Sequence, residues 1–139
     1  MYGILFHVVL LSAALVFSAC GLEDDWGFEV KNLGLQPTFD SIHDDLLAQS
    51  CAASGCHGGD DPYNGLALDQ GADAVYAQLM EASEREPLMN LVEPGEPANS
   101  ALYRALTGTG GFQPMPPTGQ IAGEDMDAVW DWIEAGAPR

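Results

Sequence analysis

The sequence predicts an all-α fold, a small bundle of short helices joined by long loops. Apolar residues recur at helical spacing in four separate stretches, which predicts amphipathic helices. Two segments rich in glycine and proline interrupt these stretches and favour loops. No two stretches alternate apolar and polar residues as a pair of half-buried strands would. A chain of 139 residues with 47% hydrophobic residues suits one folded domain and excludes a disordered or collagen-like chain.

The first segment, residues 1–19, predicts export. It carries no charge, contains an apolar run, and ends in Ser18 and Ala19 directly before Cys20, which is typical of a signal peptide. The step Phe17-Ser18-Ala19-Cys20 resembles the lipobox of bacterial lipoproteins. That resemblance implies cleavage before Cys20, lipidation of this cysteine and attachment to a membrane at the cell envelope. The alternative is an uncleaved anchor, because an apolar run of this length is just able to span a bilayer.

Residues 20–36 are predicted to form an acidic linker between the lipid and the domain. The segment shows no clean helical period, and a coil of this length spans roughly 20 to 25 Å, which would let the domain swing above the membrane. The alternative is that Trp26, Phe28 and Val30 alternate as a short strand or as a flap on the domain.

The domain itself is predicted to span residues 37–139 and to open with a helix over residues 38–50. Thr38 and Asp40 stand at the start of this helix, where N-capping and the helix dipole favour them. A loop rich in Gly and Asp is predicted over residues 55–71. The apolar face of the first helix comprises Phe39, Ile42, Leu46 and Leu47.

Two short helices are predicted next, over residues 73–82 and 99–106. A second loop, rich in Gly and Pro, separates them from the last helix, over residues 123–135. Because Trp130 and Trp132 lie two positions apart, both cannot face the core squarely, and Trp130 is predicted to be the core residue. The apolar face of the last helix comprises Met126, Val129, Trp130 and Ile133.

A cysteine pair followed directly by a histidine lies between the first helix and the first loop: Cys51, Cys56 and His57. The usual signature of covalent haem is C-x-x-C-H, in which two thioethers hold the porphyrin and the histidine binds iron. Here four small residues rather than two separate the cysteines, so they must bulge outward to match the fixed separation of the haem vinyls. The pattern predicts one covalent haem c with His57 as the proximal ligand.

A second candidate ligand, Met115, stands between Pro114 and Pro116 in the second loop. Proline fixes φ and removes a hydrogen-bond donor, so the segment is predicted to be stiff and extended, which suits holding a thioether sulfur at iron. We expect Met115 to be the distal ligand, and an axial methionine raises the reduction potential relative to histidine. His43 is predicted to lie on the surface of the first helix and is the fallback ligand.

The order of these features resembles the class I cytochrome c fold. More closely, the chain resembles the short cytochrome c-like domains of exported bacterial lipoproteins, related to the planctomycete-type cytochrome c domain. The resemblance covers about residues 38–139 and rests on residues 50–58, 91–100, 115–116 and 130–138. It implies a cytochrome c-like bundle of short helices around one haem. It also implies an electron carrier rather than an enzyme, because filling both axial positions disfavours substrate chemistry at iron.

Two other uses of the same side chains stay open. In an exported chain Cys51 and Cys56 can form a disulfide, which would leave His57 exposed and make the domain a haem-free binding module. Alternatively, Cys51, Cys56, His57 and Met115 offer thiolate, imidazole and thioether ligands, which suit copper. Haem ranks first because a disulfide accounts for neither the adjacent histidine nor the methionine between prolines.

The charge narrows the range of partners. The chain has 21 acidic and 4 basic residues, a net charge of -17, which argues against nucleic acid as a partner. Anionic lipid surfaces would repel the chain, so the lipid on Cys20 rather than charge must hold it at the membrane. We expect a redox partner protein with a basic surface.

Overall fold

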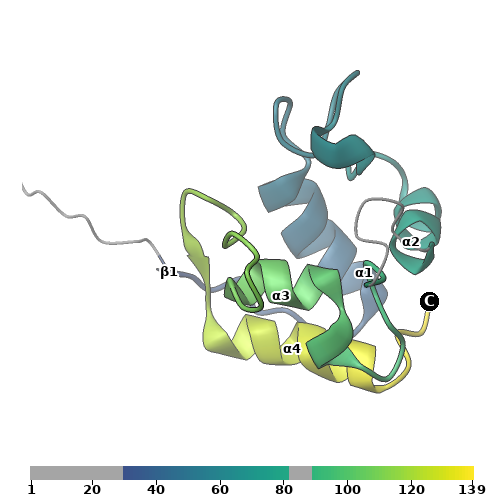
Figure 1. Ribbon diagram of the computed structural model, residues 1–139, viewed down its shortest axis with the longest axis vertical. Coiled ribbons are helices and arrows are strands. Elements are labelled where there is room, and N and C mark those ends of the chain that lie inside the picture. The colour runs from purple at the N-terminus through teal and green to yellow at the C-terminus, as the bar shows by residue number, and fades with distance from the viewer. Residues whose placement is uncertain (1–29, 82–88) are drawn as a thin grey trace, which may run out of the picture.

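Four longer helices form the framework of the described part of the chain, which is residues 30–81 and 89–139 of the computed structural model (Figure 1). They coincide with the four stretches of helical spacing in the sequence, so the mainly helical class is confirmed. Their bounds are α1 (Phe39–Ser41), which continues as the π-helix η1 (Ile42–Cys51), α2 (Ala72–Met80), α3 (Ala101–Thr107) and α4 (Gly123–Glu134). Two 3-10 turns, η2 (Tyr63–Gly65) and η3 (Pro97–Asn99), lie in the connections.

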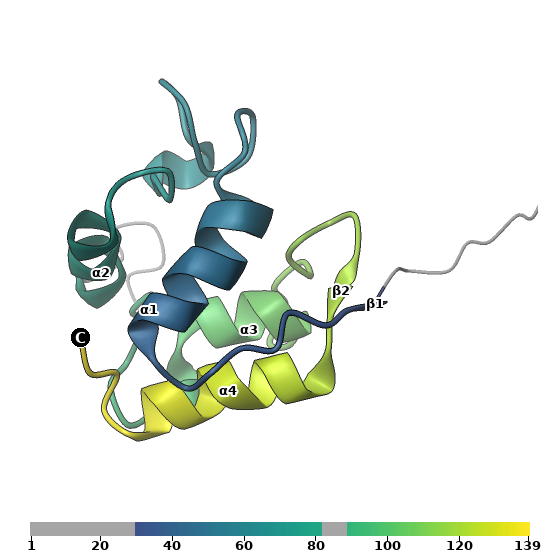
Figure 2. The same ribbon diagram turned by 180° about the vertical axis from the view of Figure 1, so that it is seen from behind.

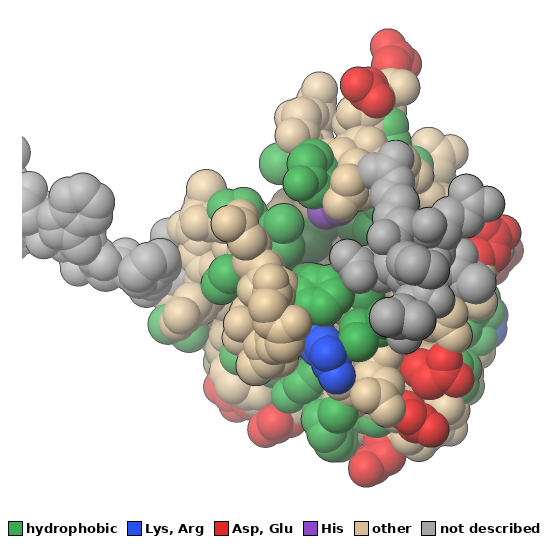
Figure 3. Space-filling model, in the orientation of Figure 1, with side chains coloured by type: hydrophobic (Ala, Val, Ile, Leu, Met, Phe, Trp, Pro, Cys, Tyr) green, Lys and Arg blue, Asp and Glu red, His purple; other side chains and the backbone are tan. Residues whose placement is uncertain are grey.

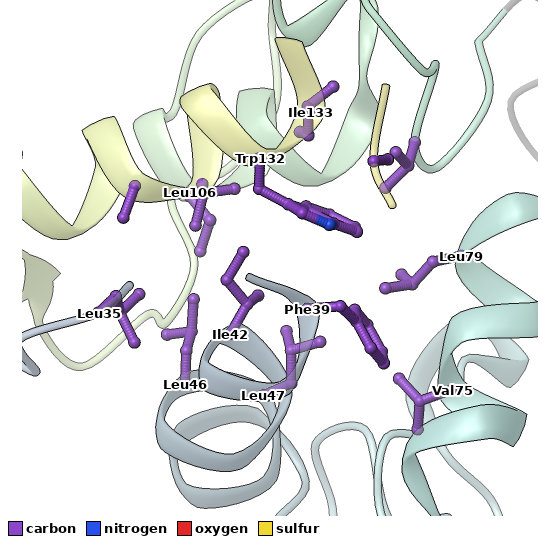
Figure 4. Packing of buried hydrophobic residues seen from close by; sticks show 14 of the residues in the cluster. Leu35, Phe39, Ile42, Leu46, Leu47, Val75, Leu79, Leu106, Trp132 and Ile133 are labelled. Carbon is purple, nitrogen blue, oxygen red and sulfur yellow. The ribbon is translucent and has the colours of Figure 1, made fainter. Parts of the chain in front are cut away.

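The helices α3 and α4 pack against each other, while η1 rises from them and packs against α2 (Figures 1 and 2). Phe39 lies where these helices meet. Its ring is 5.7 Å from that of Trp132 on α4 and 5.0 Å from that of Tyr76 on α2, measured between centroids. Figure 4 shows how the apolar side chains of all four helices converge. The fully buried apolar residues include Ile42, Leu46, Leu47, Val75, Leu79, Val129, Trp132 and Ile133.

The tryptophan assignment from the sequence is wrong. Trp132 is fully buried and its indole N–H donates to the Pro138 carbonyl at 2.9 Å. Trp130 is only half-buried and packs edge-on against Tyr103, with 5.1 Å between ring centroids. The buried face of α4 runs through Ala128, Val129, Trp132 and Ile133, so it is turned about one position from the face predicted.

The segment before the first helix belongs to the domain, which corrects the predicted linker boundary at residue 36. A parallel pair of two-residue strands, β1 (Val30–Lys31) and β2 (Gln120–Ile121), joins it to the segment before α4. This pair also corrects the expectation that no strands form. The Asp125 carboxylate accepts the backbone N–H groups of Leu33 and Leu35, at 2.5 and 2.8 Å. These two bonds, together with burial of the Leu35 side chain, fasten the segment to α4.

The C-terminal residue is fixed to the start of the chain's first helix. The Arg139 guanidinium contacts Asp40 on α1 at 2.6 Å and Asp73 on α2 at 2.7 Å. It also lies 5.0 Å from the centroid of the Phe39 ring. The ion pairs are solvent-exposed, so they contribute mainly to the placement of the last residues.

Candidate functional site

The loop that follows η1 is closed on itself, so it brings both thiols and the imidazole to the end of that helix. The His57 N–H donates to the Cys51 carbonyl at 3.0 Å, and the Cys56 N–H donates to the Ala53 carbonyl at 2.9 Å. A single parallel bridge also pairs Ser54 with Gly58. The sequence predicted that these three functional residues would cooperate, and the structure brings them together in one loop.

Residues 63–69 form hydrogen bonds with the backbone of the closed loop. The Tyr63 N–H donates to the Cys56 carbonyl at 2.7 Å, and the Leu68 N–H donates to the His57 carbonyl at 2.6 Å. The Gly59 N–H donates to the Asp69 carboxylate at 2.8 Å, and this bond is the main reason that the Asp69 pKa is lowered. The Gly- and Asp-rich loop is therefore ordered by bonds to the backbone of the Cys-His segment.

Close backbone packing within the loop explains why glycine follows His57. Gly58 is buried, and a Cβ atom at this position would lie 2.1 Å from the Ala52 carbonyl oxygen. This contact is far shorter than any that real Cβ atoms make, so a side chain here would push the two strands of the loop apart. Gly58 belongs to the stretch 50–58 on which the family resemblance rests, but its close packing against Ala52 was not predicted from the sequence.

The imidazole of His57 has no committed hydrogen bond. Its ring packs edge-on against Tyr63, with 6.1 Å between centroids. Among the described residues, His57 Nδ1 is the buried side-chain nitrogen or oxygen without a hydrogen-bond partner. A buried polar atom without a partner costs about 1 to 3 kcal/mol, so the unpaired nitrogen makes this half-buried imidazole the candidate ligand of the loop.

The two thiols differ in environment and are not joined. Cys51 is half-buried against the hydrophobic core, Cys56 is exposed, and both are free. Burial is the main cause and the nearby Cys56 a smaller one, and against the opposing effect of Lys31 they raise the pKa of the Cys51 thiol to about 11. Cys51 is therefore a neutral thiol at neutral pH, and the disulfide of the alternative reading is not formed in this structure.

Within residues 30–81 and 89–139, no group of three or more His, Cys, Asp or Glu side chains converges closely enough to hold a metal ion. Cys51, Cys56 and His57 therefore do not form a preassembled three-ligand site for copper. A bare ion takes most of its ligands from protein, whereas a haem iron takes four from the porphyrin and needs one or two from the chain. The single imidazole of His57 and the two free thiols fit the needs of a haem better than those of a bare metal ion.

Met115 lies in the loop after α3, and its N–H donates to the Ala105 carbonyl of that helix at 2.8 Å. Its side chain is half-buried. The link to the cysteine loop comes from the neighbouring residues. Pro116 and Ser50 line the same pocket of about 300 Å³, together with Lys31 and residues 118–121. The structure thus places the backbone next to Met115 near the backbone next to Cys51.

Figure 3 shows the face of the molecule on which these segments meet. The face is hollowed, apolar side chains surround the hollow, and a histidine side chain is visible in it. The Lys31 ammonium donates to the Ser50 hydroxyl at 3.1 Å at the pocket that both residues line. Lys31 was not singled out from the sequence, because nothing in its local pattern distinguishes it.

His43, the fallback ligand, is unsuited to that role. The sequence placed it on the helix surface, but it is 7% exposed and lies on the buried side of η1 with Ile42 and Leu46. Nδ1 lies 2.7 Å from the Asp44 carboxylate, and Nε2 lies 3.4 Å from the Gln70 carbonyl. Both ring nitrogens of His43 already have partners, in contrast to Nδ1 of His57.

No family model matches the chain, and neither curated proteins nor solved structures give a match. The predicted signal peptide and Cys20 lie outside the described residues. Within those residues, no helix has the length and apolar character needed to cross a membrane.

Proposed function

We propose that the chain is a lipid-anchored c-type cytochrome that carries electrons at the bacterial cell envelope and holds one covalent haem. The observation that carries this proposal is the uncommitted imidazole of His57. It stands in a closed loop with the free thiol of Cys56, at the end of the helix that carries the free thiol of Cys51.

Each of the four residues has a separate role in this proposal. Cys51 and Cys56 would attach the haem by adding their thiols across its vinyl groups, and His57 and Met115 would ligate its iron. The haem supplies the redox couple, and the chain supplies ligands, burial and orientation. With two protein ligands on iron, we expect electron transfer rather than substrate chemistry.

The fold proposed for this function is the cytochrome c-like bundle. Contacts between the first and last helices support it: Phe39 on α1 packs against Trp132 on α4, which fastens the helix leading to the cysteines. The short connection of Met115 to α3 fits a loop that closes over the second face of a flat cofactor. The lipid on Cys20 and a basic partner protein belong to the same proposal.

The first experiment asks whether haem stays attached to the denatured polypeptide. The exported chain is produced with a haem-attachment system, denatured, and separated from free haem. We expect haem to remain with the wild-type chain and to be lost from the chain carrying Cys51→Ala with Cys56→Ala. Loss of haem from the wild type, or a disulfide between Cys51 and Cys56 in the exported chain, would overturn the proposal.

The second experiment identifies the distal ligand. A ferric haem ligated by methionine sulfur has a weak absorption in the near-red, which we expect in the wild type and not in Met115→Ala. Met80→Ala is the matched control, because Met80 packs against the core from α2. An unchanged near-red band in Met115→Ala would remove Met115 from iron and leave the rest of the proposal intact.

A further inference from the structure

The helix that ends at the first cysteine is wound as a π-helix over ten residues, Ile42–Cys51. Long π-helices are rare, and short π segments occur frequently at functional sites. The wide winding continues to the very end, because the Ala52 N–H donates to the Leu47 carbonyl, five residues back, at 3.0 Å.

The burial pattern of η1 follows this wide winding. A π-helix takes about 4.4 residues per turn, so residues four and five apart share a face. Ala48 and Gln49 are exposed, which matches the solvent side of such a helix. The buried residues are Ile42, His43, Leu46 and Leu47, and the half-buried ones are Asp45, Ser50 and Cys51.

An α-helix would place Gln49 and Cys51 on the two flanks of the buried side. With about 100° per residue, the four buried residues are centred about 70° from Ile42, and Gln49 and Cys51 lie about 90° and 110° from that centre. With about 82° per residue, the nine steps from Ile42 to Cys51 make about two whole turns. The observed exposure of Gln49 and half-burial of Cys51 agree with the second case.

We propose that the π-winding of η1 is the device that positions Cys51, and that it is matched to the four-residue spacing before Cys56. The usual signature would place the first cysteine at Ala53, inside the loop. In this chain the cysteine instead stands on the helix, and the wide winding turns its thiol towards the same side as Leu46 and Leu47. This inference rests on the proposed function for the ligand, haem, but its geometric part stands on η1 alone.

The alkylation rates of single cysteines at two positions of η1 test the winding in the absence of haem. Two reduced chains carry Cys20→Ser and Cys56→Ala, so that each has one reactive thiol. The first keeps Cys51, and the second carries Cys51→Ala with Gln49→Cys. We expect the thiol introduced by Gln49→Cys to be alkylated about tenfold faster than Cys51, because position 49 faces solvent. The reverse order, or equal rates, would overturn the proposal.

A haem-attachment experiment separates this inference from the proposed function. Mass spectrometry of the wild type should show two thioethers. The chain with Cys51→Ala and Gln49→Cys should keep one, through Cys56. The chain with Cys51→Ala and Ala53→Cys restores the usual spacing and should regain two. A wild type without haem contradicts the proposed function, whereas two thioethers in the Gln49→Cys chain contradict the positioning role alone.

A measurement on the wild-type chain tests the winding without any variant that could fail to fold. In the wild-type chain, NMR couplings across hydrogen bonds should join the Ala52 N–H to the Leu47 carbonyl, five residues back. A coupling to the Ala48 carbonyl instead, four residues back, would mean α-winding and would overturn the proposal.

Discussion

Gly58 is the residue of the cysteine loop that tolerates no side chain, because a Cβ atom would lie 2.1 Å from the Ala52 carbonyl oxygen. That oxygen belongs to the backbone and cannot rotate away. We therefore expect Gly58→Ala to destabilise the domain by about 3 kcal/mol and to lower the yield of attached haem. Urea unfolding measures the first effect, and the absorbance of haem bound to denatured chain measures the second.

The matched control for this substitution is Gly123→Ala. A Cβ atom at Gly123 has nothing within 4 Å, and the residue begins α4. Its stability should change by less than about 1 kcal/mol, with haem yield unchanged. Equal losses of stability and of haem yield in Gly58→Ala and Gly123→Ala would show that close packing at Gly58 is not required.

Cys51 makes the stability of the haem-free, reduced chain depend on alkaline pH. Burial raises the pKa of its thiol from 9.0 to about 11. The unfolded chain therefore loses this proton first, so stability is fully present below pH 9 and falls between pH 9 and 11. The loss should be on the order of 2 to 3 kcal/mol.

Urea unfolding at several pH values checks this expectation against Cys51→Ala, which removes the titrating group. Burial, with Asp127, also raises the pKa of Tyr103, but this contribution is common to both chains and cancels. If the free energy of unfolding depended on pH in the same way in both chains, the assignment to Cys51 would be contradicted.

At the scale of elements, Asp125 joins the N-terminal segment to the start of α4. The carboxylate is 1% exposed and accepts the N–H groups of Leu33 and Leu35, one on each oxygen. Asp125→Ala leaves both groups without a partner and should cost about 2 to 4 kcal/mol. Asp125→Asn should cost nearly as much, because its amide nitrogen would face one of the two N–H groups.

Hydrogen exchange provides the specific readout for this joint. The amides of Leu33 and Leu35 should lose protection in Asp125→Ala, while those of α2 keep theirs relative to global stability. Glu124→Ala is the control: Glu124 accepts only the exposed Asn32 amide, so the change should be at most about 1 kcal/mol. Unchanged protection at Leu33 would contradict the proposed role of Asp125.

The helices were predictable from the sequence because apolar spacing is local information. The strands were not, because two residues are too few to show an alternating pattern. The linker boundary was misplaced for a related reason: the contacts of Asp125 join residues 90 and 92 positions apart. The π-winding could not be predicted from the sequence either, because α-helical and π-helical spacing assign clearly different faces only to Gln49 and Cys51.

The candidate site was predictable to the same extent. Adjacency in the sequence brought Cys56 and His57 together, so a single motif identified them. The place of Met115 depends on tertiary packing, which no spacing reveals, and the structure connects it to the cysteines only through Ser50 and Pro116 at one pocket. The buried state of His43 was missed because a histidine is polar, although its position shares the buried face with Ile42 and Leu46.

At the scale of the whole molecule, the charge of -17 stays largely uncompensated. The Arg139 guanidinium is already paired with Asp40 and Asp73, and the Arg104 Nε donates to the Ala98 carbonyl at 2.7 Å. These cations are therefore engaged within the protein. Acidic side chains remain on the outer surface, as Figure 3 shows for one face. Haem propionates would add to this negative field.

This field should control the rate at which the haem-loaded protein exchanges electrons. A small cationic oxidant, such as a cobalt(III) ammine complex, is attracted at low salt, so its rate should fall about tenfold between 10 mM and 500 mM salt. Ferricyanide is repelled, so its rate should rise over the same range. Stopped-flow oxidation of the reduced protein measures both, and the anionic reagent serves as the control for general effects of salt. Equal salt slopes for the two reagents would mean that the charge does not act where electrons are exchanged, and a basic partner would then gain no electrostatic attraction from it.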